Sequence, residues 1–198
     1  MNYKINEIFQ SVQGEGLWAG TAMIFIRFSG CNLKCQWCDT NHDKVNLELT
    51  AEGLIDRIRG SSIKHICLTG GEPALHIDLN LLHYLILERY HIHIETNGTI
   101  PLSKEIKKHL SWVTVSPKKN WILTSGHELK VIWNGQTAEE LEKYFDSDFH
   151  YYFLQPEWGY VSGITTPFNH TMKQLTNIIM EDPRWRLSLQ LQKLINVK

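Results

Sequence analysis

Residues 25–40 read FIRFSGCNLKCQWCDT, a stretch that joins the end of an apolar run to three closely spaced cysteines. The β-branched and aromatic residues of Thr21–Phe28 predict a strand. Cys31, Cys35 and Cys38 follow its carboxyl end with the spacing C-x3-C-x2-C. Thiolates are soft ligands that select zinc or iron–sulfur clusters over hard cations. The stretch therefore predicts a metal centre at the end of a strand, where α/β folds place their chemistry.

The rest of the chain alternates apolar β-like runs with helical patterns, which favours βα units and a mainly parallel sheet. The predicted strands are Lys64–Thr69, His91–Thr96, Ser111–Val115, Leu129–Trp133, Tyr151–Gln155 and Trp185–Leu191. The predicted helices are Thr50–Arg59, a segment capped by Asp78, Ser103–His109, a segment that starts with the capping box Thr137–Glu140, and Thr171–Met180. A complete eight-stranded barrel takes about 250 residues, so a chain of 198 residues favours an α/β fold with a partial, open TIM-like barrel.

Length and composition predict a single domain over residues 1–198 and exclude wholesale disorder. Hydrophobic residues make up 42% of the chain, which is ordinary for a globular protein. The net charge of −1 provides no global field for binding nucleic acid or an anionic membrane. The first residues are polar, unlike a secretory signal, and no apolar stretch approaches the roughly 20 residues that span a bilayer. We therefore expect a cytoplasmic protein with no direct nucleic-acid or membrane partner.

The cysteines alone leave two kinds of metal centre open. A 4Fe–4S cluster usually takes four cysteines, so three would leave one iron free to chelate another molecule. A structural zinc ion is the alternative, because His42 would complete a Cys3His tetrahedron. Cys67 lies within a predicted apolar strand and is interpreted as a small buried core residue. His91 and His93 alternate along one strand and are interpreted as packing or edge residues.

A second motif, Thr69-Gly70-Gly71-Glu72-Pro73, follows the next predicted strand. Its glycines would let the backbone approach a ligand closely, and Glu72 could pair with an ammonium group. By itself the motif also fits an ordinary Gly-Pro turn. Together the two motifs resemble the cluster loop and the GGEP element of the radical S-adenosylmethionine (SAM) superfamily. The resemblance implies a 4Fe–4S cluster on the three cysteines with SAM beside it, its amino group received by the GGEP element.

Further segments over nearly the whole chain resemble one radical SAM family, the 7-carboxy-7-deazaguanine synthases of 7-deazapurine (queuosine) biosynthesis. These segments are Asn6–Gly16 with its QGEG loop, Phe25–Cys31, Cys38–Thr40, Ile94–Gly98, Val113–Lys118, Leu154–Pro156 and Trp185–Gln190. The resemblance implies a lyase that converts 6-carboxy-5,6,7,8-tetrahydropterin to 7-carboxy-7-deazaguanine by a radical ring contraction with loss of ammonia. It also implies assistance by Mg²⁺, an electron donor such as flavodoxin or ferredoxin, and a homodimer.

The same resemblance gives roles to individual residues, none of them a catalytic acid or base, because SAM carries the radical. The cluster ligands would be Cys31, Cys35 and Cys38, and the Mg²⁺ ligand would be the hydroxyl of Thr40. SAM would be bound by Trp37, Cys38, Asp39, Gly71, Glu72, Glu95, Ser116, Pro117, Lys118 and Gln155. The pterin substrate would be bound by Val12, Gln13, Gly14, Arg27, Thr69 and Lys198.

For two of these residues, an interpretation without a bound ligand is also open. Arg27 interrupts an apolar strand just before the cysteines, and a guanidinium suits bidentate recognition of a carboxylate. A surface cation at a strand end is the alternative for Arg27. Thr40 could serve as a turn hydroxyl that bonds local backbone instead of a metal ligand.

The resemblance is weakest at the tail. Family members commonly end with a Thr-His-Lys-type segment, whereas Gln192 stands where the histidine is expected. Lys198 is the residue whose terminal carboxylate we expect at the substrate. Two other functions stay open at this point. One is a radical SAM activase that generates a glycyl radical on a partner protein, although it would not need the QGEG loop or Arg27. The other is a non-catalytic, zinc-stabilised binding module.

Overall fold

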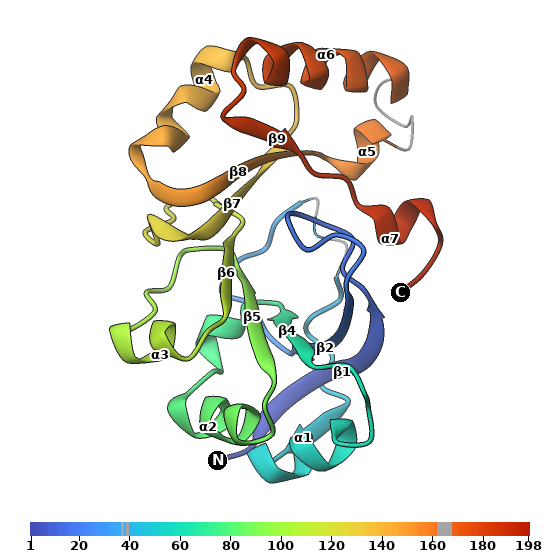
Figure 1. Cartoon of the computed structure of the whole chain (residues 1–198), viewed down its shortest axis with the longest axis vertical. Helices are drawn as coiled ribbons and strands as arrows, with labels where there is room; N and C mark the ends of the chain where they lie inside the picture. The colour runs from blue at the N-terminus through green and yellow to red at the C-terminus, as the bar shows by residue number, and fades with distance from the viewer. Residues whose placement is uncertain (37, 39, 162–167) are drawn as a thin grey trace.

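The computed structural model describes residues 1–36, 38, 40–161 and 168–198. Within them the strands form a nine-stranded sheet in the order β3-β1-β2-β4-β5-β6-β7-β8-β9, which runs along the molecule in Figure 1. The strands are β1 (Tyr3–Val12), β2 (Ala22–Phe28), β3 (Leu47–Leu49), β4 (His65–Gly70), β5 (His91–Thr96), β6 (Trp112–Val115), β7 (Ser125–Trp133), β8 (Asp148–Pro156) and β9 (Trp185–Leu187). The α-helices are α1 (Ala51–Ile58), α2 (Leu79–Leu87), α3 (Lys104–Lys108), α4 (Ala138–Glu142), α5 (Trp158–Val161), α6 (Phe168–Glu181) and α7 (Leu191–Leu194).

Most neighbouring strands run parallel. From β2 to β9, each strand in the sheet order is parallel to the next one. The first strand, β1, pairs antiparallel with both β2 and β3. Because β3 and β9 lie at opposite edges of the strand order, the sheet is open. The predicted α/β fold with an open, mainly parallel sheet is confirmed, and the carboxyl ends of the parallel strands meet at one edge.

Side-chain caps define where several helices start. Thr50 accepts a hydrogen bond from Gly53 N at the start of α1, and Asp78 accepts one from Leu81 N at the start of α2. Such a cap is worth about 1 kcal/mol, because it satisfies a backbone donor that has no partner within the helix. The predicted capping box between Thr137 and Glu140 is present in α4.

Alternation along the strands gives the sheet two different faces. Ile66 and Leu68 of β4 belong to the main apolar core, which also contains the buried residues of α1 and α2. Burying each such aliphatic side chain contributes roughly 1.5–3 kcal/mol. Cys67, between them, packs on the other face in a small cluster with Met23 and Phe25. The prediction that Cys67 is a buried core residue is therefore confirmed.

The structure differs from the predicted elements near the ends of several helices and strands, and it contains β1, α5 and α7, which are not among the strands and helices predicted from the sequence pattern. The helix that follows the capping box is short, and its chain continues as a 3₁₀ turn, Lys143–Asp146. The last predicted strand ends at Leu187, because the chain turns there toward α7. The short edge strand β3 was not predicted, since three residues carry too little pattern.

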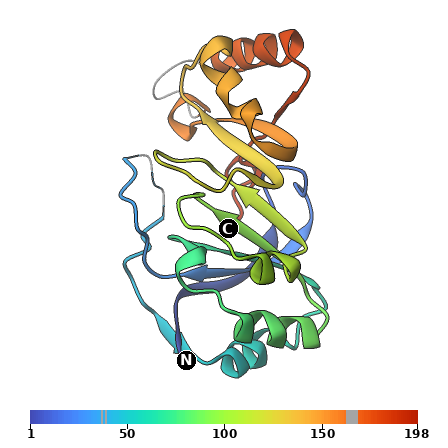
Figure 2. The same cartoon turned by 90° about the vertical axis from the view of Figure 1, so that its left-hand side faces the viewer.

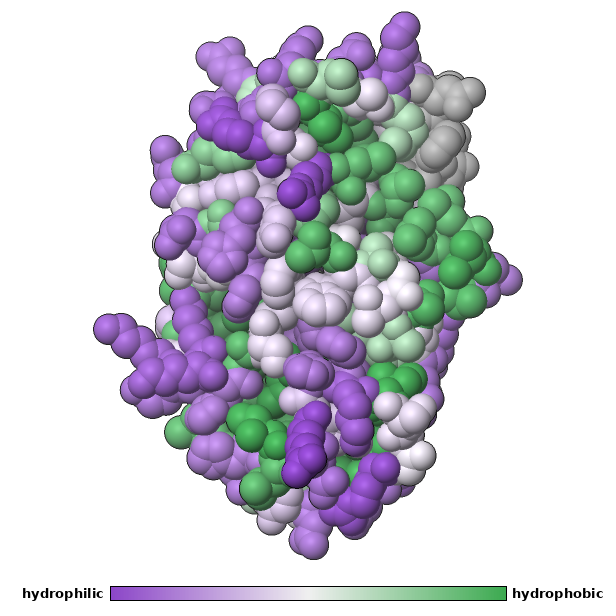
Figure 3. All heavy atoms as spheres, in the orientation of Figure 1, coloured by the Kyte–Doolittle hydropathy of each residue, from purple (hydrophilic) through white to green (hydrophobic). Residues whose placement is uncertain are grey.

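Figure 2, turned by 90°, shows α1 and α2 at one end of the molecule and α4 and α6 at the other, with the sheet between them. No helix in the described part of the chain is long and apolar enough to cross a membrane. The face drawn in Figure 3 has a hydrophobic area where Figure 1 places α7. Leu194, Ile195 and Val197 of this tail are exposed.

Candidate active site

A cavity of about 320 Å³ opens at the carboxyl ends of the parallel strands. Its walls come from β1, β2, the cysteine loop, the ends of β4 to β8, and the tail. Among the residues expected at the site, those that line this cavity are Val12, Gln13, Gly14, Arg27, Cys31, Cys35, Cys38, Thr40, Thr69, Gly71, Glu95, Ser116, Lys118, Gln155 and Lys198. Trp37 and Asp39 lie outside the described residues. The structure thus brings together most of a site drawn from segments far apart in the sequence.

The three cysteines suit an iron–sulfur cluster. Cys31, Cys35 and Cys38 are free thiols that line the same cavity. Leu33 N lies 3.4 Å from Cys31 Sγ and donates a hydrogen bond to it. Three soft ligands, one of which accepts a hydrogen bond from the backbone, match the donor set of a 4Fe–4S cluster with one open iron.

A single zinc ion fits this arrangement less well. Among the described residues, no group of three or more His, Cys, Asp or Glu side chains converges as a single ion would require. His42 lines the cavity, but it does not complete such a group with the cysteines. Cys67 is buried in the small apolar cluster beneath the cavity and does not join the three thiols.

The glycines of the GGEP motif allow the two loops to touch. Gly71 N donates to Phe28 O at 3.2 Å, and Glu72 N donates to Gly30 O at 3.0 Å. A Cβ atom on Gly71 would lie 2.0 Å from the carbonyl oxygen of Gly30. A side chain at position 71 would therefore push the motif away from the cysteine loop.

The carboxylate of Glu72 is engaged by the protein itself. It is fully buried, outside the lining of the cavity, and accepts hydrogen bonds from Thr96 Oγ1 at 2.6 Å and Asn97 N at 2.7 Å. A third bond comes from Ala74 N at 2.9 Å. Burial raises the pKa of Glu72, although these bonds oppose the shift. Glu72 here ties the GGEP loop to the end of β5, and its expected contact with the SAM amino group stays a prediction.

Arg27 and Thr40 meet at the wall formed by β1 and β2. Glu7 is paired with Arg27 across the two strands, and its Oε1 accepts a hydrogen bond from Arg27 Nε at 2.8 Å. Arg27 also donates from Nη1 to Thr40 Oγ1 at 3.3 Å. The second oxygen of Glu7 pairs with the ammonium of Lys198. Burial alone would raise the pKa of Glu7, but hydrogen bonds from Lys198 and Arg27 lower it.

The tail closes one side of the cavity by bonding to the QGEG loop. Leu191 N donates to Gly14 O at 3.0 Å, and Ser11 Oγ donates to the backbone oxygen of Lys198. Gln192, which stands where the family has a histidine, donates to Glu15 Oε1 at 3.1 Å. The divergent tail thus retains direct contact with the loop expected to hold the substrate.

Lys130 is a site residue that the sequence analysis missed. Its side chain is buried, lines the cavity, pairs with Glu15, and lies 3.7 Å from Glu95 Oε1. Gln13 Nε2 donates to the same Glu95 oxygen at 3.0 Å. Burial would raise the pKa of Glu15, but the charge of Lys130 lowers it to about 2. A lysine within a strand of a parallel sheet was the available signal, because lysine is rarely buried unless it is paired.

The loop after β6 contributes a second lysine. Lys118 Nζ donates to Ser116 Oγ at 2.7 Å and to Ser116 O at 3.1 Å. Burial lowers the pKa of Lys118 to about 8. Both residues line the cavity, whereas Pro117 lies on a neighbouring groove. Gln155, which also lines the cavity, is buried and accepts a hydrogen bond from Ser188 Oγ.

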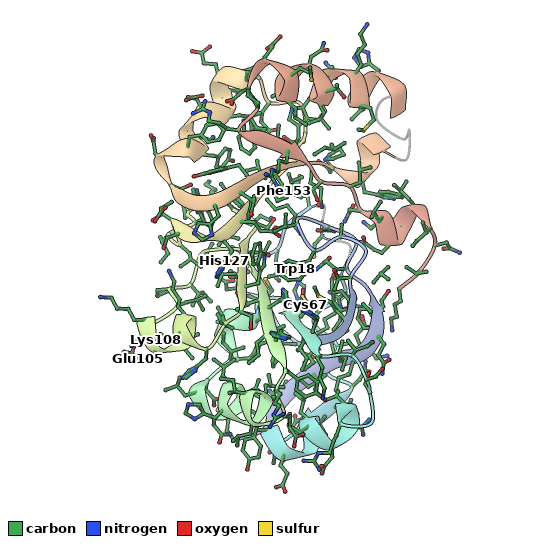
Figure 4. The ribbon with its side chains drawn as sticks, in the orientation of Figure 1. Trp18, Cys67, Glu105, Lys108, His127 and Phe153 are labelled. Carbon is green, nitrogen blue, oxygen red and sulfur yellow. The ribbon has the colours of Figure 1, made fainter. Side chains whose placement is uncertain are left out.

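Histidine and tryptophan rings fill the same face of the sheet further from the cavity. His65 Nδ1 lies 2.9 Å from His93 Nε2, and Trp18 packs edge-on against His93. Figure 4 shows Trp18, Cys67 and His127 near the middle of the molecule. Burial lowers the pKa of His93 to about 3. His93 therefore packs as a neutral ring, as its packing interpretation predicts.

Comparison with known proteins agrees with these observations. Residues 25–157 match the family model of the radical SAM superfamily. The 7-carboxy-7-deazaguanine synthase of Bacteroides thetaiotaomicron is 42% identical over the full length of both chains. The protein of the same name from Burkholderia multivorans is 34% identical, again over both full lengths.

A solved structure gives the same result for the fold. The crystal structure of QueE from Escherichia coli superimposes with a TM-score of 0.75 and 29% sequence identity. The superposition covers 96% of this chain and 94% of that chain. With the three cysteines gathered at the carboxyl edge of an open sheet, these matches show that the chain belongs to the 7-carboxy-7-deazaguanine synthase family of radical SAM enzymes, whose cofactors are a 4Fe–4S cluster and SAM.

Proposed function

We propose that this enzyme is a 7-carboxy-7-deazaguanine synthase, a carbon–nitrogen lyase of 7-deazapurine (queuosine) biosynthesis. It converts 6-carboxy-5,6,7,8-tetrahydropterin to 7-carboxy-7-deazaguanine with loss of ammonia. The observation that carries this proposal is one cavity lined at once by the three cysteines, Arg27 and the QGEG loop. An activase acting on a protein glycine would not need the last two of these features.

The residues around the cavity divide between cofactor and substrate. When bound, the reduced cluster and SAM supply a 5′-deoxyadenosyl radical. Cys31, Cys35 and Cys38 hold the cluster in this proposal. The residues that hold SAM are Gly71, Glu95, Ser116, Lys118 and Gln155, which lie at or just after the ends of β4, β5, β6 and β8. The protein contributes binding and orientation, while the cofactors carry the radical chemistry.

Arg27 binds the substrate carboxylate in this proposal. Its guanidinium is held at Nε by Glu7, which fixes the plane of the fork before the substrate arrives. A pre-oriented guanidinium loses less side-chain entropy on binding a carboxylate. In the same cavity, Gln13, Glu95 and the buried Lys130 provide donors and acceptors for the polar edge of the pterin ring.

Mg²⁺ is proposed to bind at Thr40. Mg²⁺ prefers oxygen ligands and commonly takes few of them from the protein, keeping water or substrate oxygens. The hydroxyl of Thr40 lines the cavity beside Arg27, so an ion there would sit next to the proposed carboxylate site. Omission of Mg²⁺ should therefore weaken substrate binding without removing the cluster.

The proposed enzyme is a cytoplasmic homodimer that receives electrons from flavodoxin or ferredoxin. Its free cysteines suit a reducing compartment. The exposed apolar side chains of Leu194, Ile195 and Val197 are available for contact with a second copy. Light scattering of the reconstituted enzyme gives the mass; a monomeric mass would contradict the homodimer.

The decisive test is mass spectrometry of an anaerobic reaction. Reconstituted protein is mixed with SAM, Mg²⁺, dithionite and 6-carboxytetrahydropterin. We expect 7-carboxy-7-deazaguanine to form while SAM is largely regenerated. Accumulation of 5′-deoxyadenosine without that product would show a radical SAM enzyme with a different substrate.

A further inference from the structure

A second hollow, about 560 Å³ in volume, adjoins the cysteine end of the active site. Cys35 and Lys118 line both hollows, so they form the wall between them. We call the second hollow the lysine groove, after its four lysines, Lys34, Lys118, Lys119 and Lys143. One cluster ligand therefore lies at the boundary between the catalytic cavity and an outer groove.

The charged side chains that line the lysine groove in the described chain are all positive. Its lining in the described chain contains the four lysines and no carboxylate, whereas the whole chain has a net charge of −1. Lys34, Lys119 and Lys143 are exposed, so their ammonium groups stand in water. They come from three separate segments: the cysteine loop, the loop after β6, and the turn after α4. The positive charge is thus spread around a rim.

A rim of exposed ammonium groups suits a protein partner better than a small anion. Small anions are commonly held by buried, pre-oriented donors, and these three lysines are exposed. Spread charges on a surface accelerate and orient protein association. Electron-transfer complexes use small, transient interfaces of this kind. A partner that matches this rim carries negative charge.

We propose that the lysine groove is the docking surface for an acidic electron-transfer protein, which reduces the cluster from the side of Cys35. One electron leaves the reduced donor protein and enters the cluster, and no covalent bond forms or breaks. The inference rests on the radical SAM chemistry of the proposed function, because that chemistry needs a one-electron reductant. It adds the surface at which the reductant binds.

The test compares two double variants with the intact enzyme. Lys119→Gln/Lys143→Gln removes two rim charges from exposed positions. Lys104→Gln/Lys108→Gln removes two exposed charges from α3 and is the matched control. Figure 4 shows Lys108 projecting from α3 into solvent, and Lys107 of the same helix bonds Ser125 at the start of β7. The control pair is therefore on a helix that contacts the amino-terminal edge of the sheet, away from the cysteines.

The probe is an acidic flavodoxin. Its Kd for each reconstituted protein is measured by titration at low and high salt, and the rate at which it reduces the cluster is followed by visible absorption. At low salt we expect the groove variant to weaken Kd about tenfold and to slow reduction in parallel, while the control changes Kd less than twofold. High salt should diminish the difference, because exposed charges are screened.

Dithionite-driven turnover separates this proposal from the proposed function. We expect both variants to form product at the rate of the intact enzyme with dithionite, because the small reductant needs no docking surface. Equal flavodoxin affinities for the two variants would overturn the docking surface. A loss of dithionite-driven activity in the groove variant would overturn it too, since the lysines would then act in the catalytic cavity. If the intact enzyme makes no product with dithionite, the proposed function fails, whereas the flavodoxin Kd still tests the surface.

Discussion

The same strands carry two contrasting environments on one face of the sheet. Near their carboxyl ends, β4 and β5 present Thr69 and Glu95 to the cavity. Two positions earlier they present Cys67 and His93, which are buried beneath it and paired across the strands. The first environment holds the ion pairs of Lys130 with Glu15 and Glu95, whereas the second is neutral and filled by rings. A displacement of two residues along a strand thus separates the reactive end of this fold from its packed end.

This contrast has a physical origin. Residues two apart in a strand share a face, so both environments lie on the same side of the sheet. At the carboxyl ends the loops are free to carry glycines and cysteines, and ligands can enter. At the amino ends Trp18 covers the face against His93 and Trp112, so charge there would be buried without a partner.

Loss of a thiol should have the largest effect at the reactive end. We expect Cys35→Ala to abolish cluster assembly and SAM cleavage, because two cysteines leave the cluster without a third ligand. Visible absorption of the anaerobically reconstituted protein and formation of 5′-deoxyadenosine are the measurements. Cys67→Ala is the matched control at the packed end and should retain both signals. A brown, SAM-cleaving Cys35→Ala protein would refute the cluster assignment.

Removal of the buried ammonium should be the next largest effect. Lys130→Met leaves the largely buried Glu15 and the partly exposed Glu95 without their cation, and breaking a buried pair such as Lys130 and Glu15 costs about 3–5 kcal/mol. Urea unfolding measures this loss. Lys173→Met on the exposed side of α6 is the control and should stay within about 0.5 kcal/mol. A loss below about 1 kcal/mol for Lys130→Met would show that the site does not depend on this charge.

Arg27→Ala should weaken substrate binding and leave the cluster intact. A charge-assisted hydrogen bond contributes about 1.5–3 kcal/mol, which corresponds to roughly 10- to 100-fold in Kd. Titration of 6-carboxytetrahydropterin into the reconstituted protein provides the value. Arg27→Lys keeps the positive charge but loses the two-pronged guanidinium, so its affinity should lie between those of the intact enzyme and Arg27→Ala. Unchanged affinity in Arg27→Ala would remove this residue from the substrate site.

The neutral His93 at the packed end of the sheet should make the free energy of unfolding depend on pH. The pKa of His93 is about 3 in the folded chain and about 6.5 in an unfolded one. The unfolded state therefore binds more protons, so the stability from neutral His93 is complete above pH 6.5 and is lost as pH falls toward 3. The expected loss at pH 5 is on the order of 2 kcal/mol.

Unfolding free energies between pH 7 and pH 4 test this expectation. His93→Phe keeps a ring of similar shape without a titrating nitrogen, so its stability should fall less steeply over that range. Glu15, whose pKa is about 2 in the folded chain, adds a loss of the same sign, but its window lies below pH 4.5. Identical slopes for the intact protein and His93→Phe would show that His93 does not set the acid response.

The sequence predicts the parts of this molecule that depend on local pattern. Two apolar runs predict strands β2 and β4. The cysteine loop directly follows the first run and the GGEP motif the second, so the sequence predicts the position of both motifs. The shared edge of a parallel sheet then brings these residues into one cavity. The open sheet likewise follows from chain length and alternation.

The rest depends on contacts that no local pattern records. Lys130 meets Glu15 from a position 115 residues away, and within its own strand it is only a polar residue in an apolar run. Glu72 is of a residue type that could bind a ligand, but its carboxylate accepts hydrogen bonds from Thr96 and Asn97 within the protein. In both cases the tertiary environment, and not the residue type, determines what the side chain does.

The bonds between the tail and the QGEG loop have a consequence for the order of folding. Gln190 and Gln192 reach Glu15 across 175 and 177 residues of chain, so these contacts close a loop of almost the whole polypeptide. Closing such a loop costs conformational entropy before the contacts are formed that offset this cost. Contacts of this sequence range therefore form slowly. We therefore expect a refolding chain to recover its sheet before its affinity for substrate, with the wall of the active site the last part to become native.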